Sequence, residues 1–178
     1  MMEHPLSQFK YCPKCGSAHF GVNNCKSKQC ADCGFVYYFN PSSATVALIL
    51  NEQNELLVCR RAKEPAQGTL DLPGGFIDIA ETGEEGVSRE VKEETGMEVT
   101  KAEYLFSLPN TYIYSGFPVQ TLDMFFRCTV TDTVHFKAMD DAAEAFFLPL
   151  KEIRAEEFGL RSIRKGLEKF LEIKAPIP

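Results

Sequence analysis

The chain has 178 residues, of which 44% are hydrophobic, so it can bury one good core and a small additional module. Its formal net charge of −6 argues against broad electrostatic binding to nucleic acid. No apolar run approaches the roughly 20 residues needed to cross a membrane, and the first residues lack the apolar segment of a signal peptide, so we expect a cytoplasmic protein.

The N-terminal part of the chain carries paired cysteines. We expect residues 1–8 to form a disordered tail and residues 9–38 to form a zinc ribbon. The ribbon is based on two Cys-x-x-Cys pairs, each followed by a glycine that lets the loop turn: Cys12, Cys15, Cys30 and Cys33. Four thiolates form a closed tetrahedral zinc site, and zinc would supply the folding energy of so short a segment. Cysteines without metal, or redox-active cysteines, are the alternative.

Residues 39–178 are expected to form the second domain. Residues 42–50 read as a buried strand and residues 55–62 as its antiparallel partner in a hairpin. Cys59 alternates into this apolar pattern, which indicates a core residue rather than a nucleophile.

The most informative stretch of the chain is residues 75–97. Thr82 followed three residues later by Glu85 is a capping box, so a helix is expected to begin near Gly83. The helix is expected to stop at Gly96, because glycine suits the left-handed cap.

Acidic residues gather on one face of this helix: Glu90, Glu93 and Glu94. At roughly 100° per residue they fall within an arc of about 100°. Like charges on one helical face repel each other, and Arg89 supplies only one positive charge, so a further cation is needed. Carboxylate oxygens suit Mg²⁺ or Mn²⁺, which commonly bind substrate phosphates as well. The stretch therefore predicts a divalent-metal site for a phosphoanhydride.

The pattern of residues 75–97 resembles a complete Nudix box, the signature of the Nudix hydrolases. The matching residues are Gly75, Glu81, Arg89, Glu90, Glu93, Glu94 and Gly96. The resemblance implies an α/β/α sandwich with a mixed sheet, of the α/β (α+β) class, preceded here by the small zinc ribbon. It also implies hydrolysis of a nucleoside diphosphate linked to another group, with Mg²⁺ or Mn²⁺ as cofactor. A solvated acidic helix on an unrelated fold is the alternative.

The resemblance also assigns roles within the box. Glu90 and Glu94 would be the principal metal ligands, and the carbonyl near Gly75 would complete the metal shell. Glu93 would be a further ligand or the base that deprotonates water, and Glu90 remains the other candidate for the base. Arg89 would orient the carboxylates.

Two neighbouring positions support the helix. By the resemblance, Glu81 would pair with the arginine of the box or form hydrogen bonds with the preceding loop. Gly86 lies inside the expected helix, where glycine costs about 1 kcal/mol relative to alanine. We interpret this glycine as a sign of close backbone packing.

The remaining elements follow the box. Residues 98–110 and 121–130 read as strands separated by the aromatic-rich segment 110–120. Residues 146–149 resemble the end of the last strand, and residues 160–171 repeat apolar side chains at helical spacing. We therefore expect a C-terminal helix that covers one face of the sheet.

Candidate substrate-binding residues lie outside the box. Tyr112 and Tyr114 could stack on a base or nicotinamide ring, or they could pack against the sheet. Arg60 either meets substrate phosphate or is an ordinary solvated charge. Asp123 and the acidic group at 140–144 could supply a further ligand or base from a loop.

The layout of a zinc ribbon ahead of a Nudix domain is similar to that of NAD(H) diphosphatases, which also act on NAD-capped RNA. Those enzymes carry a motif of the type Ser-Gln-Pro-Trp-Pro-Phe-Pro, whereas this chain has no tryptophan. NADH, ADP-ribose and related nucleotides therefore stay open as substrates.

A second hypothesis is a non-catalytic, nucleotide-sensing regulator or binding module whose ribbon contacts nucleic acid or protein. The intact box favours the enzyme. The basic patch of the ribbon is thin, so nucleic acid is not expected as a partner except as capped RNA. The ribbon is instead expected to be a structural or dimerisation element, which leaves a homodimer open.

Overall fold

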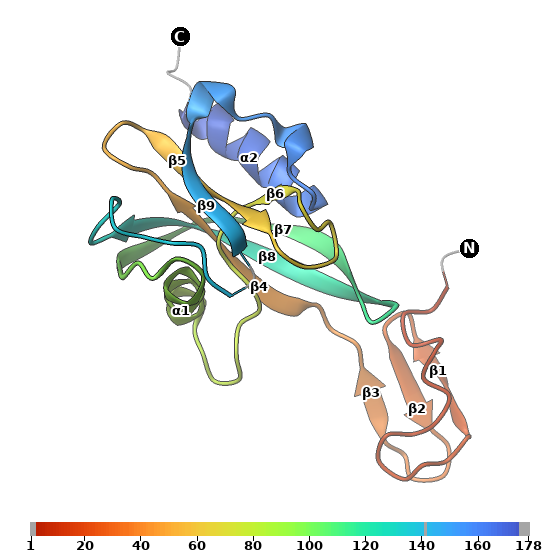
Figure 1. The fold of residues 1–178 in the computed structure, drawn as a ribbon. Helices are drawn as coiled ribbons and strands as arrows, with labels where there is room; N and C mark the ends of the chain where they lie inside the picture. The colour runs from red at the N-terminus through yellow and green to blue at the C-terminus, as the bar shows by residue number, and fades with distance from the viewer. Residues whose placement is uncertain (1–2, 141, 175–178) are drawn as a thin grey trace. The chain divides into compact units, whose positions relative to one another are not determined.

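The computed structural model describes residues 3–140 and 142–174 (Figure 1). The chain divides into two compact units between Pro41 and Ser42, a few residues beyond the boundary expected after residue 38. None of the described helices is long and apolar enough to cross a membrane.

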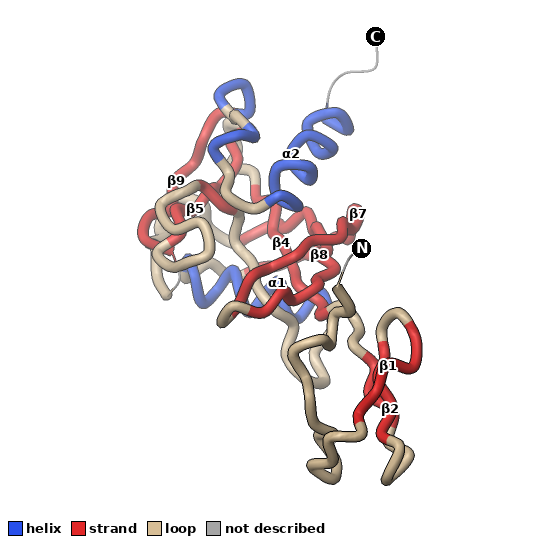
Figure 2. The backbone as a smooth tube through the Cα atoms, turned by 90° about the vertical axis from the view of Figure 1, so that its right-hand side faces the viewer, coloured by secondary structure: helices blue, strands red, loops and turns tan. Residues whose placement is uncertain are grey.

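The first unit is a small antiparallel sheet held around cysteines. Its strands, in the order β1-β2-β3, are β1 (Phe20–Asn24), β2 (Ser27–Cys30) and β3 (Val36–Tyr38). Figure 2 shows the described part of this unit as strands and loops without a helix. Its apolar cluster contains three buried residues, Cys12, Phe20 and Cys30, which is too few to stabilise a fold alone.

The described residues that precede this sheet are ordered into turns. The amide of Ser7 donates to the carbonyl of His4 at 2.8 Å, and Leu6 is completely buried. In the described part of the segment expected to form a disordered tail, residues 3–8, the chain thus forms a turn and buries one apolar side chain. Residues 1 and 2 lie outside the described residues.

Over its described residues, 42–140 and 142–174, the second unit contains two three-stranded sheets and two α-helices (Figure 1). One sheet has the order β4-β8-β7, and it is mixed because β4 pairs with β8 in parallel whereas β7 pairs with β8 antiparallel. The other sheet is antiparallel, with the order β6-β5-β9. The bounds are β4 (Ser42–Ile49), β5 (Glu55–Arg61), β6 (Leu70–Asp71), α1 (Gly83–Thr95), β7 (Val99–Tyr114), β8 (Phe117–Val130), β9 (Ala142–Pro149) and α2 (Arg161–Lys174).

The two helices cover opposite faces of β4. Val46 and Leu48 pack in a cluster with apolar residues of α2, whereas Ala47 and Ile49 pack in a second cluster with residues of α1. Alternate side chains of a strand point to opposite faces, so β4 is buried on both sides. Figure 1 shows α1 and α2 on either side of the strands, which confirms the predicted α/β/α sandwich.

The prediction that residues 42–50 and 55–62 pair along their length in a hairpin is wrong. The turn between these strands forms, since the side chain of Asn51 accepts hydrogen bonds from the amides of Gln53 and Glu55. An isolated bridge joins Leu50 to Leu56, but beyond it β4 pairs with β8 and β5 pairs with β6 and β9. The central parts of both runs, residues 46–50 and 56–59, are continuously apolar, a pattern that a hairpin and two separate buried strands share.

The aromatic-rich segment 110–120 is part of a long hairpin and does not separate two strands. β7 and β8 continue through it and turn at Ser115 and Gly116, which have φ angles of 50° and 72°. Two consecutive residues with positive φ match the twist of a tight antiparallel hairpin. Tyr112 therefore lies on a strand, paired in register with Val119.

Candidate active site and metal centres

Helix α1 has the limits that the sequence predicts. The amide of Glu85 donates to Thr82 Oγ1 at 3.2 Å, and the amide of Thr82 donates to Glu85 Oε2 at 2.8 Å. Gly96 ends the helix in the left-handed conformation, with φ at 75°. The capping box fixes where the acidic face of the helix begins.

Arg89 joins the acidic residues at the start of the site. Its guanidinium donates to both carboxylate oxygens of Glu81, from Nε at 2.9 Å and from Nη2 at 3.0 Å. Arg89 Nη1 donates to Glu90 Oε1 at 2.8 Å and to Glu93 Oε2 at 3.0 Å, and Nη2 donates to the Phe76 carbonyl at 2.9 Å. These contacts, led by those with Glu81, raise the pKa of Arg89, so it stays charged.

The Gly-Gly loop packs directly against two glutamates. The amide of Gly74 donates to Glu94 Oε2 at 3.1 Å, and the carbonyl of Gly75 accepts from the amide of Thr45 at 2.8 Å. A Cβ at Gly75 would lie 2.6 Å from Glu90 Oε1, so no larger residue fits while Glu90 keeps its position. The loop and the helix therefore form one site.

Gly86 has the close packing that we expected. A Cβ at this position would lie 3.1 Å from Glu81 Oε2 and 3.3 Å from Ile77 Cγ1. The glycine lets the preceding loop come close enough for Glu81 to reach Arg89 and to accept a hydrogen bond from the amide of Asp78 at 2.9 Å.

The glutamates of the box are near one another but do not converge on one point. Over the described ranges, only the four cysteines form a group of three or more His, Cys, Asp or Glu ligands whose donor atoms all lie within 4.8 Å. Glu90 and Glu93 are directed to Arg89, and Glu94 is directed to the amide of Gly74. Burial raises the pKa of Glu90, Arg89 opposes this effect, and the charges of Glu93 and Glu81 add to it. A hard cation beside these carboxylates would offset their mutual repulsion.

A cleft of about 360 Å³ opens beside these glutamates. Its lining includes Glu90, Glu93 and Glu94 and residues from the strands β4 to β9, among them Tyr112 of β7, together with Asp140. Tyr112 packs edge-to-face on Phe76, with ring centroids 6.0 Å apart. Tyr114 is not among the lining residues and stacks on Tyr112 at 6.5 Å.

Arg60 lines the cleft but is already engaged. Its Nε donates to Glu144 Oε2 at 2.9 Å, and its Nη1 donates to the carbonyl of Gly68 at 2.9 Å. Glu144 itself is not among the lining residues, and residue 141 of the acidic group lies outside the described residues. Asp140 has a φ angle of 49° and follows Met139, whose amide donates to the carbonyl of Glu94 at 2.9 Å.

The cleft also contains an ion pair that the sequence analysis missed. Arg61 Nη1 donates to Asp71 Oδ2 at 2.5 Å, and Arg61 Nη2 lies 3.5 Å from Tyr112 Oη. Burial raises the pKa of Asp71, and the nearby charge of Arg61 opposes this effect. A charged residue between Leu70 and Leu72 was the signal in the sequence, because aspartate is rarely placed in a buried strand without a partner.

Asp123 lies in a strand, not in the loop that we expected. It is buried on β8, where it pairs in register with Ala44 of β4. Its carboxylate accepts hydrogen bonds from Thr121 Oγ1 at 2.6 Å and from Ser162 Oγ at 2.5 Å. A carboxylate held in this way has little freedom to move towards the glutamates of α1.

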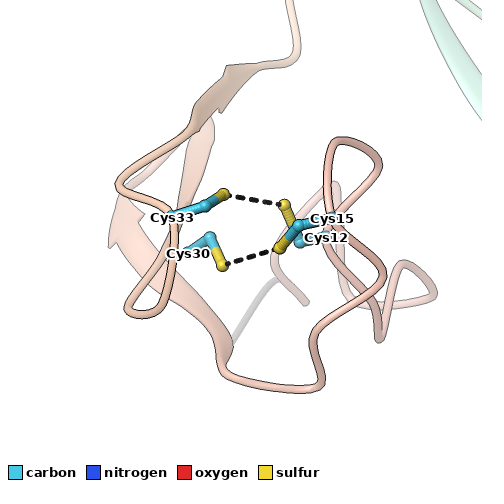
Figure 3. Close-up of side chains that lie close together, drawn as sticks. All are labelled: Cys12, Cys15, Cys30 and Cys33. Atoms are coloured by element: carbon cyan, nitrogen blue, oxygen red, sulfur yellow. Dashed lines mark hydrogen bonds between the residues drawn. The ribbon is translucent and has the colours of Figure 1, made fainter.

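The four paired cysteines of the first unit point towards one another (Figure 3). The sulfur atoms of Cys12 and Cys33 are 3.7 Å apart, as are those of Cys15 and Cys30. Four sulfurs around zinc at about 2.3 Å would form a tetrahedron with edges of about 3.8 Å, so the cluster has the size of such a site. The hydrogen bond from the Cys33 amide is the main influence that lowers the pKa of the Cys30 thiol, to about 6, and so favours the thiolate.

The other ligand candidates of this unit stand apart from the cluster. Cys25 is exposed, and His19 Nδ1 lies 3.1 Å from Asp32 Oδ1. Gly16 and Gly34, which follow the two pairs, have φ angles of 76° and 72°. They provide the loop turns that the sequence predicts, because glycine adopts positive φ without strain.

The sequence is similar to those of known nucleotide hydrolases. An ADP-ribose pyrophosphatase from Methanocaldococcus jannaschii is 34% identical over 135 residues, which cover 72% of this chain and 73% of that protein. An NAD-capped RNA hydrolase from Vibrio vulnificus is 33% identical over 108 residues, or 60% of this chain and 40% of that protein. This chain therefore spans well under half of the length of the Vibrio relative.

The similarity extends to solved structures and to the family as a whole. The crystal structure of a NUDIX hydrolase from Nitrosomonas europaea superimposes with a TM-score of 0.69 at 25% identity and covers 92% of this chain and 90% of that chain. The sequence profile of the NUDIX domain matches residues 40–170, most of the second unit. Because it has the residues of the Nudix box, the α/β/α sandwich and this match over most of the second unit, the chain belongs to the Nudix hydrolase family.

Proposed function

We propose that this protein is a Mg²⁺- or Mn²⁺-dependent hydrolase that cleaves the diphosphate bond of a nucleoside diphosphate linked to another group. NADH, ADP-ribose and related nucleotides are the candidate substrates. The observation that carries the proposal is the network in which Arg89 holds Glu90 and Glu93 beside the Gly-Gly loop at the edge of the cleft. The names of the two relatives, an ADP-ribose pyrophosphatase and an NAD-capped RNA hydrolase, support these substrate classes.

The residues of the box fit a divalent cation. Glu90, Glu93 and Glu94, together with the carbonyl of Gly75, offer the hard oxygen donors that Mg²⁺ and Mn²⁺ prefer. When bound, the cation neutralises phosphate oxygens and lowers the pKa of a bound water. Arg89 keeps the carboxylates in position, and Glu93 or Glu90 accepts the proton of the attacking water.

The substrate side of the site is formed by residues outside the box. Tyr112 presents an aromatic surface within the cleft and supports stacking of a base or nicotinamide ring. Tyr114 stacks on Tyr112 and reinforces it from outside the lining. Arg60 binds a substrate phosphate when it gives up its contact with Glu144, because the phosphate carries more negative charge than the Glu144 carboxylate.

A hydrolysis screen tests the proposal. Purified protein is supplied with Mg²⁺ or Mn²⁺ and with NADH, ADP-ribose, sugar nucleotides, dinucleoside polyphosphates and (d)NTPs, and the products are identified by mass. We expect release of a nucleoside monophosphate from one substrate class. If every substrate stays intact although metal is bound, the evidence favours the nucleotide-sensing module instead.

Gly75→Ala is expected to lower kcat/KM by about 100-fold, because a misplacement of about 1 Å in a catalytic group costs this much. The new Cβ would lie 2.6 Å from Glu90 Oε1 and would displace that carboxylate. The neighbour that must move is the flexible end of a side chain, so the melting temperature should change little. Steady-state kinetics and thermal unfolding measure the two effects.

Gly21→Ala is the matched control, because a Cβ at that position would meet no atom within 4 Å. It should leave both kinetics and stability unchanged. Normal activity of Gly75→Ala would show that Glu90 does not need its observed position.

A further inference from the structure

Asp123 is a buried carboxylate in the cleft that the proposed reaction does not use. Asp123 is only 5% exposed, yet it is one of the residues that line the cleft. One oxygen accepts from Thr121 Oγ1 and the other from Ser162 Oγ. Both donors are neutral hydroxyl groups.

Asp123 has no cationic partner among the described residues. Across the described part of the chain, no ion pair includes Asp123, and the guanidinium of Arg61 is bound to Asp71 instead. Burial of an ionised carboxylate is unfavourable unless a cation or hydrogen bonds compensate for it. Ser162 is the second residue of α2, so the positive end of the helix dipole reduces this cost without providing a counter-ion.

Asp123 also retains hydrogen-bonding capacity. A carboxylate has about four acceptor sites, and the two hydroxyl groups occupy one on each oxygen. Asp71, the other buried carboxylate of the cleft, is engaged more strongly, because Arg61 binds Oδ2 and the amide of Leu72 donates to Oδ1 at 2.8 Å. Asp123 is therefore the better acceptor for a donor that enters the cleft.

The sheet places Asp123 close to the Gly-Gly loop at Gly74 and Gly75. Ala44 pairs in register with Asp123 on one side and forms an antiparallel bridge to Phe76 on the other. At about 4.8 Å between neighbouring strands, the backbone of Asp123 lies about 10 Å from that of Phe76, the residue after Gly75. A nucleotide whose diphosphate lies at the glutamates of α1 can reach this far with its ribose or base.

We propose that Asp123 is a specificity-determining residue that accepts a hydrogen bond from the nucleoside part of the substrate. The donor is either the 2′-hydroxyl of a ribose or the exocyclic amine of the base, since both present the same chemistry to a carboxylate. Thr121 and Ser162 are positioning residues that hold its two oxygens in place. The inference rests on the proposed function, because it requires a nucleotide in this cleft.

Matched substrate analogues test the inference on the unmodified protein. The first pair exchanges adenine for hypoxanthine, which removes the amine, and the second exchanges ribose for 2′-deoxyribose, which removes one hydroxyl. We expect one of these changes to raise KM and Kd by about 10- to 100-fold, the effect of losing one hydrogen bond to a charged group, with kcat little changed. If the two members of each pair have equal KM and Kd values, the inference is overturned. This outcome does not depend on whether any variant folds.

Asp123→Asn then identifies the residue. The amide keeps the shape of the side chain but removes the carboxylate. In this variant, the ratio of the Kd values for the analogue pair that the unmodified protein distinguishes should fall to about twofold or less. Asp132→Asn, a change of the same chemistry at a half-buried carboxylate that pairs with His135 outside the cleft, should keep full discrimination. If Asp123 only joins α2 to the sheet, Asp123→Asn lowers the melting temperature and leaves discrimination intact, which would refute the assignment.

Binding and turnover are measured separately so that the two proposals can fail separately. Discrimination in Kd without hydrolysis of any substrate would contradict the proposed function and support the role of Asp123. Hydrolysis without discrimination would contradict the role of Asp123 alone. A protein that binds no nucleotide would contradict both.

Discussion

Glu94→Gln is expected to lower kcat by about 100-fold or more, because removal of one preorganised electrostatic group at a reacting phosphate costs at least this much. Glu94 lines the cleft, and its Oε2 accepts a hydrogen bond from the amide of Gly74 at 3.1 Å. Glutamine keeps a carbonyl oxygen for this hydrogen bond, so the loop and the fold should persist. The loss of charge should weaken binding of Mg²⁺ or Mn²⁺.

Three measurements separate these effects: kcat with saturating substrate, Mn²⁺ affinity by titration, and the midpoint of thermal unfolding. Glu98→Gln is the matched control, because Glu98 is exposed and pairs with Lys92 Nζ at 2.6 Å outside the cleft. It should behave as the unmodified protein in all three. Near-normal turnover by Glu94→Gln would refute the assignment of Glu94 as a metal ligand.

Cys30→Ser is expected to release zinc and unfold the first unit while hydrolysis continues. Cys30 is 1% exposed and belongs to a core with Cys12 and Phe20, so its loss removes both a sulfur of the four-cysteine cluster and a core contact. Zinc binding contributes about 10–16 kcal/mol in small zinc domains, more than so small a core supplies. The second unit has its own apolar clusters and should remain folded.

Zinc content by elemental analysis and amide exchange of residues 20–38 measure the loss directly. Cys25→Ser is the control, because Cys25 is exposed and lies outside the four-cysteine cluster. That variant should retain stoichiometric zinc and the protected strands. Tight, stoichiometric zinc in Cys30→Ser would instead mean that the ligand set is wrong.

Parts of this protein could be predicted from the sequence because they depend on short-range interactions. The capping box at Thr82 and Glu85 and the left-handed Gly96 define α1 through contacts within one turn of helix. Each Cys-x-x-Cys pair is followed by a glycine that turns the chain, so spacing alone indicated the cluster. The grouping of the box glutamates on one face follows from the period of the helix.

The cleft depended on pairings that no local pattern reveals. Residues 46–50 and 56–59 are apolar on both faces, so the sequence pattern could not show that β4 would pair with β8 and β5 with β9. Only this separation into two sheets creates a space that Asp71 and Asp123 line together. These two residues are far apart in the chain, and neither belongs to a motif.

The sequence by itself determined the family, the acidic helix and the cysteine cluster, because each of these needs only residues at fixed short spacings. The tertiary structure decided where β4 and β5 find their partners, how Tyr112 comes to line the cleft, and which carboxylates stay buried there. The physical reason is that strand pairing and burial are determined by contacts between distant segments, whose free energies a local pattern does not contain.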